Sequence, residues 1–163
     1  MTGPRSEAVG TDLGAAIEPH LRSRLEGKAP SVFTELRADR IEVGGYDVWS
    51  VVTFEQGEYR VTNDGRAGPR LRMQTNDFGA VQLELYQAWA LSGAASDVLR
   101  DYLQGFADDE KELDTENGQL VRWGDDRWAR TYGACTPRML RAFAGRSIPD
   151  VDGFVNRLVE ARS

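Results

Sequence analysis

Four arginines gathered in one short stretch, GEYRVTNDGRAGPRLR at 57–72, are the first side chains in this sequence that could do chemistry. Guanidinium groups bind phosphate oxygens through charge-assisted hydrogen bonds, and a turn at Asn63-Asp64-Gly65 would add backbone amide donors. One hypothesis is therefore a loop that binds an anion or a nucleic acid. The other is a solvated turn, because Asn, Asp and Gly form turns for backbone reasons alone and no GxxxxGK[ST] phosphate loop is present. The four arginines are Arg60, Arg66, Arg70 and Arg72.

A second basic region covers residues 127–146, which hold five arginines and no acidic residue. These arginines lie on or before a predicted helix that is followed by a tight turn and another helix, an order similar to that of helix-turn-helix proteins. Trp123, Trp128 and Tyr132 could stack on nucleic-acid bases. The alternative is that the arginines pair with acidic side chains within the molecule while the tryptophans pack in the core. The candidate contacts in this region are Arg130, Arg138 and Arg141.

The acidic residues concentrate between residues 101 and 120, where there are seven of them against Lys111 alone. This segment carries a net charge of −6, equal to that of the whole chain, so the remaining residues sum to zero. Clustered carboxylates attract basic partners and raise association rates. We expect an acidic surface here that binds a protein partner, with Tyr102 and Trp123 among the aromatic residues buried in the contact. The seven acidic residues are Asp101, Asp108, Asp109, Glu110, Glu112, Asp114 and Glu116.

Metal, cofactor and nucleophile chemistry has little support in the residue types. His20 and Cys135 are each the only residue of their kind, whereas a structural zinc site takes about four ligands. Asp109-Glu110-Lys111 has the Asp-x-Lys pattern of metal-dependent nucleases but lacks apolar flanks. The GxSxG, HExxH and GxGxxG motifs are missing from the sequence. We therefore predict no metal and no cofactor, and an enzyme would have to be built from scattered carboxylates, at least two of which converge in one pocket.

The elements that must position these side chains begin with a helical pattern at 11–27, in which apolar residues recur every four positions. Pro19 predicts either a kink in this helix or a helix that begins at Pro19 itself. The β-branched and aromatic residues of 46–54 predict a strand, and alternation in 58–62 predicts a second one, joined to the first by a turn at Gln56-Gly57.

Further elements follow along the rest of the chain. In chain order they are a strand at 71–73, either a strand or the start of a helix at 81–85, a helix at 96–106, a hairpin at 112–123 that turns at Asn117-Gly118, and two helices capped by Thr136 and Ser147. Strand hairpins and helices in this mixture predict the α+β class. We expect one domain at 11–163, with a small antiparallel sheet packed against several helices and a helical C-terminus, preceded by a mobile tail at 1–10.

Length and composition agree with one globular domain. The 163 residues are 40% hydrophobic and 28% charged, without a run of apolar residues long enough to span a membrane. The first residues lack the pattern of a secretory signal, and a single cysteine forms no internal disulfide. These features predict a cytoplasmic protein without a membrane partner, and they leave the oligomeric state open.

The order of motifs resembles a family of small prokaryotic and phage domains of unknown function. Members of that family end a strand in Leu-Thr-Asp-Asp-Gly or a similar sequence, and a later Leu-rich helix ending in Gly-Phe precedes an acidic hairpin. Here the strand ends in Val61-Thr62-Asn63-Asp64-Gly65, the helix is 98–106, and Asn117-Gly118-Gln119 belongs to the hairpin. The resemblance covers roughly residues 30–146, and Asn63 replaces the first Asp of the family motif. It implies a fold and a bacterial or phage context, but no activity.

From the sequence we expect a non-enzymatic interaction protein that binds a basic protein through the acidic surface, such as an inhibitor, an immunity factor, or a subunit of a phage-defence or counter-defence complex. The first alternative is a nucleic-acid-binding module that uses the arginine-rich stretch 60–72 and the basic C-terminal helices. The second alternative is an enzyme that uses carboxylates.

Overall fold

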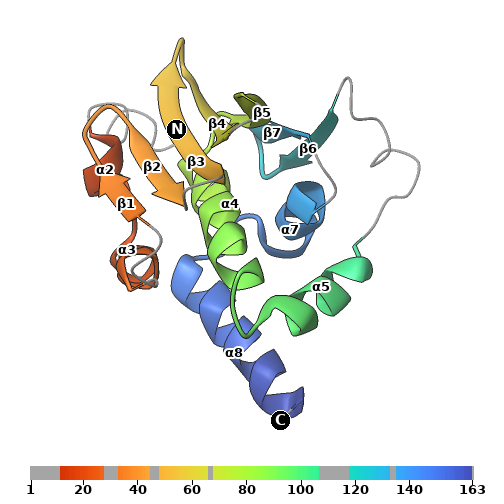
Figure 1. Cartoon of the computed structure of the whole chain (residues 1–163). Coiled ribbons are helices and arrows are strands. Elements are labelled where there is room, and N and C mark those ends of the chain that lie inside the picture. The colour runs from red at the N-terminus through yellow and green to blue at the C-terminus, as the bar shows by residue number, and fades with distance from the viewer. Residues whose placement is uncertain are drawn as a thin grey trace.

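The protein is an α+β domain built on one antiparallel sheet (Figure 1). This computed structural model describes residues 12–27, 33–44, 48–65, 68–106, 118–132 and 135–162. Seven strands form the sheet in the order β1-β2-β3-β4-β5-β7-β6, and every neighbouring pair is antiparallel. The strands are β1 (Phe33–Leu36), β2 (Ile41–Gly44), β3 (Val48–Glu55), β4 (Glu58–Gly65), β5 (Arg70–Thr75), β6 (Gln119–Trp123) and β7 (Arg127–Thr131). The predicted fold class is confirmed.

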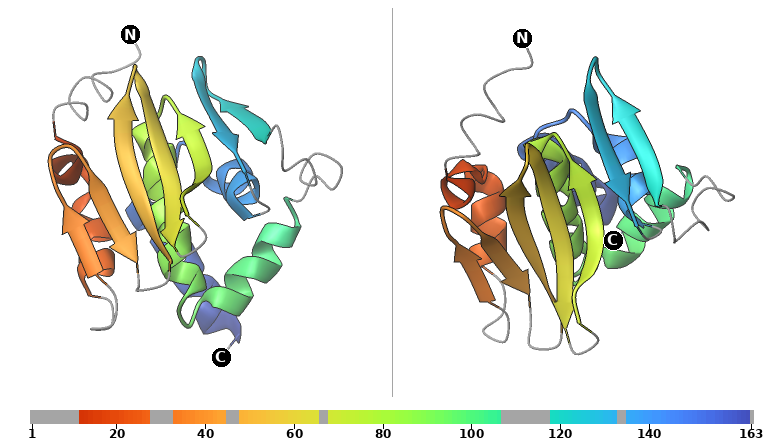
Figure 2. Two further views of the ribbon diagram at one scale, coloured as in Figure 1. Left: turned by 45° about the horizontal axis from the view of Figure 1, so that its top comes forward. Right: turned by 90° about the horizontal axis from the view of Figure 1, so that it is seen from above.

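The helices gather on one side of the sheet, as the two further views in Figure 2 show. Within the described residues they are α2 (Leu13–Ala16), α3 (Pro19–Glu26), α4 (Phe78–Leu91), α5 (Ser96–Gln104), α7 (Cys135–Phe143) and α8 (Ile148–Arg162). Helix α4 packs against β4 and β5, α7 packs against β6, and α8 contacts α3, α4 and α5 as an outer layer. None of these described helices has the length and apolar character needed to cross a membrane.

Helix α4 and the centre of the sheet share the main apolar core. Tyr59, Val61 and Met73 are fully buried on the face that α4 covers. The ring of Tyr59 lies 5.4 Å from that of Phe78 at the start of α4. The apolar run that begins at Val81 continues to Leu91 and is longer than a typical strand. The segment 81–85, for which the sequence allowed a strand or the start of a helix, is therefore part of a helix.

The N-terminal helical pattern is divided at Pro19, as the sequence predicted. Asp12 caps α2, and its Oδ1 accepts a hydrogen bond from the Ala15 amide at 3.0 Å. A new helix begins at Pro19, where the missing amide hydrogen costs nothing because the first turn has no acceptor for it. The cap predicted at Ser147 is also confirmed, since its Oγ accepts a hydrogen bond from the Asp150 amide.

The turn predicted at Asn63-Asp64-Gly65 is wrong. These residues are the last part of β4 and pair with Ser50, Trp49 and Val48 on β3. Pairing along the whole length of β3 overrides the local turn preference, so the chain reverses later, where the Gly68 amide donates to the Gly65 carbonyl. Gly68 has a φ of 89°, which glycine adopts without strain.

Of the hairpin predicted at 112–123, the structure describes only the strand Gln119–Trp123, because residues 107–117 lie outside the described part of the chain. This strand pairs with β7 through a turn at Gly124. The sequence did not predict strands β1, β2 and β7. Thr136 does not act as the expected cap, since α7 already begins at Cys135.

Candidate functional site

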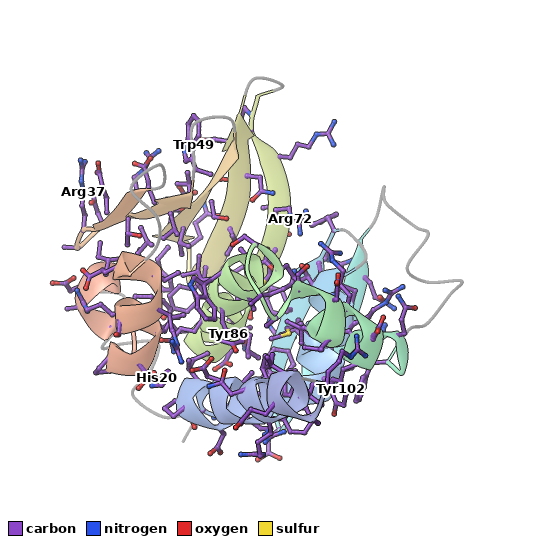
Figure 3. All side chains as sticks on the ribbon, turned by 60° about the horizontal axis from the view of Figure 1, so that its bottom comes forward. His20, Arg37, Trp49, Arg72, Tyr86 and Tyr102 are labelled. Carbon is purple, nitrogen blue, oxygen red and sulfur yellow. The ribbon has the colours of Figure 1, made fainter. Side chains whose placement is uncertain are left out.

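A β-bulge turns Arg72 toward the helical side of the sheet. Val61 pairs with Met73, but the next residue of β4 pairs with Leu71, so Arg72 is the extra residue at the register shift. In a regular strand Arg72 would point away from the face on which Met73 is buried. Because a bulge breaks this alternation, the Nη2 atom of Arg72 lies 3.7 Å from Oε2 of Glu84 on α4. Figure 3 shows Arg72 between the sheet and this helix.

Arg72 lies beside a pocket of about 370 Å³ between strands β2 to β5 and the C-terminal half of α4. The volume falls within the range of small-molecule sites. Apolar lining comes from residues such as Val43, Leu85 and Leu91. The polar side chains that line the pocket are Ser50, Asn63, Arg72, Glu84 and Gln87.

The strand side of the pocket is polar because Ser50 and Asn63 replace apolar residues at the end of the core. The two residues pair across β3 and β4, and Ser50 Oγ donates a hydrogen bond of 3.3 Å to Asn63 Oδ1. The next inward-facing pair is Val52 with Val61, and both are fully buried. The sheet face therefore changes from apolar to polar within two residues, at the position where Arg72 enters.

Glu84 is a buried carboxyl group held between two elements. Its side chain is 3% exposed. Thr136 Oγ1 on α7 donates a 2.8 Å hydrogen bond to its Oε1 atom. Burial raises the pKa of Glu84, while the charge of Arg72 and the bond from Thr136 lower it in part. A buried carboxyl group with a raised pKa beside a charged partner is a typical feature of functional sites.

Two residues that line the pocket each have a buried polar atom without a hydrogen-bonding partner among the described residues: Gln87 its Oε1 and Arg72 its Nε. Gln87 as a whole is only 3% exposed. Gln82 on the same helix differs, since its Oε1 accepts a 2.7 Å hydrogen bond from the Glu18 amide. Buried polar atoms in proteins nearly always have partners, so the exception at Gln87 calls for a physical explanation.

The two tryptophans at the pocket differ in position. Trp49 neighbours Ser50 along β3, so strand alternation directs its ring to the opposite face of the sheet, and Figure 3 shows it well away from α4. Trp89 belongs to α4, and its ring lies 5.2 Å from the Arg24 guanidinium. Trp89 is therefore the aromatic side chain on the helical wall.

A second polar cluster joins α3, α4 and α8 around Asp152, which is almost fully buried. Asp152 Oδ2 accepts hydrogen bonds from Arg24, and His20 Nε2 lies 2.5 Å from the same atom. Tyr86 donates to Oδ1 at 2.8 Å. Burial raises the pKa of Asp152, but the hydrogen bonds from His20, Arg24 and Tyr86 outweigh it, so the pKa is lowered. The carboxylate is well satisfied, which indicates that this cluster holds the helices together.

The structure describes only part of the predicted acidic surface. Asp108, Asp109, Glu110, Glu112, Asp114 and Glu116 lie outside the described residues. Asp101 is exposed, and its Oδ2 lies 2.9 Å from Nη2 of Arg162. Tyr102 packs against Phe143 and Phe154, so part of its ring belongs to the helical core. Trp123 is half-buried at the end of β6.

The predicted arginine contacts do not form one site. Arg72 faces Glu84, whereas Arg60 lies on the opposite face of the sheet, in a row with Gln74 and Arg130. Glu55, Glu58 and Asp64 share that face by strand alternation, so its charge is mixed. Arg70 is exposed, and Arg138 is half-buried on α7. Arg141 donates a 2.8 Å hydrogen bond to the Phe106 carbonyl. Arg66 lies outside the described residues.

Sequence reasoning missed Glu84 and Gln87. The signal was their spacing: two polar residues three apart in the apolar run FGAVQLELYQAWAL share one side of a helix. A metal site receives no support from the described residues, since no three His, Cys, Asp or Glu side chains gather there.

The described chain is thus an α+β domain in which a seven-stranded antiparallel sheet and its central helix enclose a pocket with buried polar groups. Compared with models of protein families, with curated proteins and with solved structures, the chain matches none. The resemblance to a family of small prokaryotic and phage domains therefore stays a prediction.

Proposed function

We propose that this protein is a binding domain that takes a small polar molecule into the pocket between the sheet and α4. The observation that carries the proposal is Gln87, which lines the pocket and whose Oε1 atom is buried without a hydrogen-bonding partner among the described residues. An unsatisfied buried amide oxygen costs roughly 1–3 kcal/mol. Proteins tolerate such a cost mainly where function requires the polar group.

The carboxylate-enzyme hypothesis has weaker support than binding. It required two acidic groups that converge in one pocket. Among the described residues that line this pocket, Glu84 is the one carboxylic acid. Its partners Arg72 and Thr136 satisfy it from two sides, which favours a positioning role over proton transfer.

Gln82 offers a matched control for testing the proposal. We would replace each glutamine by methionine, which has a similar shape but no amide. Gln82→Met loses a satisfied hydrogen bond and should lower the free energy of unfolding by about 1 kcal/mol. Gln87→Met removes an unsatisfied group and should leave the stability unchanged or raise it by up to about 1 kcal/mol. Urea unfolding measures both.

A fragment screen tests the binding itself. Fragments that occupy the pocket should raise the Tm of the wild type and of Gln82→Met but not that of Gln87→Met, because a ligand stabilises only the state that binds it. The proposal fails if no fragment distinguishes the wild type from Gln87→Met, or if Gln87→Met is as destabilised as Gln82→Met.

The second candidate function is binding of a basic protein in the cytoplasm of a bacterium or of a phage-infected cell. Leu120 favours it: this residue is 38% exposed, the large hydrophobic residue most open to solvent among those described. It lies on the edge strand β6, which follows the acidic segment 107–117 in sequence. A contact would combine electrostatic steering by the acidic residues with burial of Leu120.

Capture from nuclease-treated lysate tests this second function. The variant combines Asp108→Asn, Asp109→Asn, Glu110→Gln and Glu112→Gln, and Leu120→Ser is made separately. A protein retained by the wild type and lost by both variants supports the interface. A control with Glu26→Gln and Glu160→Gln, both exposed on helices elsewhere, should retain it. Equal capture by all proteins contradicts the interface.

A further inference from the structure

We infer that the open face of the sheet binds single-stranded nucleic acid along strands β7 and β6. This surface is separate from the pocket, whose helical wall is α4. The described helices gather on the α4 side of the sheet (Figure 2), and the open face is the opposite one. Ala129 and Thr131 on β7 are almost fully buried, so they point toward the helices. Because side chains alternate along a strand, the residues next to them point to the open face.

Strand β7 and the residue after it present two aromatic rings on this face with an arginine between them. The three residues are Trp128, Arg130 and Tyr132, and each is half-buried. The Tyr132 amide donates a 3.0 Å hydrogen bond to the Arg72 carbonyl, so the pairing with β5 continues one residue beyond β7. At about 3.3 Å per residue, the two aromatic residues are about 13 Å apart along the chain. Aromatic side chains on a sheet face that no described helix covers form a candidate contact surface.

Strand β6 adds a second arginine beside Trp128. Arg122 pairs with Trp128 across the two strands, and its side chain is exposed. Directly opposite residues of neighbouring strands have their Cβ atoms about 5 Å apart. Trp128 therefore has Arg122 across from it and Arg130 two residues further along its own strand. Leu120, which pairs with Arg130, adds apolar surface because it is 38% exposed.

The open face is positive where β5, β7 and β6 form it. Arg130 lies in one row with Gln74 on β5 and Arg60 on β4, so three arginines, including Arg122, point to this face. Strands β5, β6 and β7 contain no acidic residue. The acidic residues of the open face on β3 and β4 are Glu55, Glu58 and Asp64, which lie at the ends of these strands. Phosphate groups are therefore attracted along β7 and β6 and repelled on the β3 side.

The combination of rings and arginines favours a single strand over other acidic partners. Unpaired bases stack on aromatic side chains while arginines neutralise the neighbouring phosphates, and both contacts tolerate any base sequence. In a duplex the bases are already stacked on one another, so the two rings gain no stacking partner. An acidic peptide would pair with the arginines but would leave the rings of Trp128 and Tyr132 unused.

Fluorescence anisotropy with the full chain tests this inference. The labelled probes are oligouridine and oligothymidine of about 12 nucleotides, a DNA duplex of the same length, and a polyglutamate peptide. Both single strands should bind at least about tenfold more tightly than the duplex and the peptide. Three arginines predict that the logarithm of the binding constant falls with the logarithm of the salt concentration with a slope of about −2.

Variants separate stacking from charge. Trp128→Leu should weaken the binding at least about fivefold, whereas Trp128→Phe keeps an aromatic ring and should retain most of it. Arg122→Gln should weaken the binding and make the salt slope shallower by about 0.7. Because Arg122 is exposed, this variant keeps its fold even if Trp128→Leu does not. The control is Arg157→Gln, at an exposed position of α8 among the helices, which should bind like the wild type.

Three results would overturn the inference. The first is that the wild type binds neither single strand. The second is that the duplex or polyglutamate binds as tightly as the single strands, which would reduce the surface to a set of charges. The third is unchanged binding by Arg122→Gln or by a folded Trp128→Leu, which would place the contact elsewhere. The pocket is tested separately by the fragment screen, so none of these results bears on the proposed function.

Discussion

Tyr86 on α4 donates a 2.8 Å hydrogen bond to Oδ1 of Asp152 on α8. Tyr86 is fully buried, and Figure 3 shows it directed from α4 toward α8. The ring of Tyr86 also lies 5.5 Å from that of Trp89, which lines the pocket. The same tyrosine thus connects the pocket wall to the cluster that holds the outer helix in place.

Tyr86→Phe should lower the free energy of unfolding by about 1.5–3 kcal/mol, because it removes a buried hydrogen bond to a charged carboxylate without changing the packing. Urea denaturation measures the loss. Tyr102→Phe is the control, since the Tyr102 ring is only half-buried and contacts other aromatic rings. If the two variants lose the same stability, the bond to Asp152 contributes nothing specific.

Asp152 should make the protein sensitive to acid. The folded-state pKa lies below the ordinary value of 3.8, so the unfolded chain binds a proton before the folded one does. The stabilisation by Asp152 is therefore present above that value and is lost as the pH falls through the folded-state pKa. We expect Asp152→Asn to be less stable than the wild type at pH 6, with a difference that shrinks as the pH falls below about 4. Asp150→Asn, at an exposed position of the same helix, is the matched control for the loss of a carboxylate.

Glu84 should give the opposite dependence. Burial raises its folded-state pKa above the ordinary 4.5. At a pH between 4.5 and the folded-state pKa, the folded state therefore holds a proton that the unfolded state has released. The free energy of unfolding of the wild type then falls as the pH rises above about 4.5, by at most about 1.4 kcal/mol per pH unit, and levels off above the folded-state pKa.

Glu84→Gln, which does not titrate, should gain stability relative to the wild type over this range of pH. Unfolding in urea at intervals from pH 4 to pH 8 measures the difference between the two proteins. A difference that stays constant across the range would show that Glu84 has an ordinary pKa. It would also remove the electrostatic part of the argument for a functional pocket.

Local signals in the sequence predicted those elements that depend on neighbouring residues. Pro19 divides the first helical segment, and Gln56-Gly57 forms the turn of the β3–β4 hairpin with φ values of 53° and 80°. Pairing over long distances could not be predicted in this way. Strand β5 pairs with its neighbour β4 on one side but with the distant β7, not β6, on the other. The turn-forming residues at 63–65 continue β4 because β3 extends alongside them.

The pocket was not predictable for the same reason. Arg72 was a candidate contact, but its direction depends on a bulge that only the register between β4 and β5 reveals. Glu84 and Gln87 interrupt an apolar helix, and nothing local shows that the side of the helix they occupy is buried. The sequence therefore predicted one polar residue of the pocket, Arg72. The residues that lie near it depend on tertiary packing and could not be predicted.

Gly14 and Gly153 offer opposite predictions for the same substitution. A Cβ atom at Gly14 would lie 2.5 Å from the backbone carbonyl carbon of Leu36, because α2 packs directly against the chain that leaves β1. Backbone cannot move aside as a flexible side chain can, so Gly14→Ala should lower the free energy of unfolding by about 1–3 kcal/mol. The Gly14 amide also donates a 2.8 Å hydrogen bond to the Arg37 carbonyl, which such a displacement would weaken.

Gly153→Ala should instead raise the stability by about 0.5–1 kcal/mol. Gly153 lies within α8, where glycine is less favourable than alanine, and the nearest atom to its added Cβ is the end of the Arg157 side chain at 3.6 Å, an ordinary contact. Thermal and urea unfolding of both variants measure the two changes in stability, which should be of opposite sign. If Gly14→Ala is as stable as the wild type, α2 does not pack against the Leu36 backbone in solution. If Gly153→Ala is destabilised, the packing around the middle of α8 is tighter than the distances indicate.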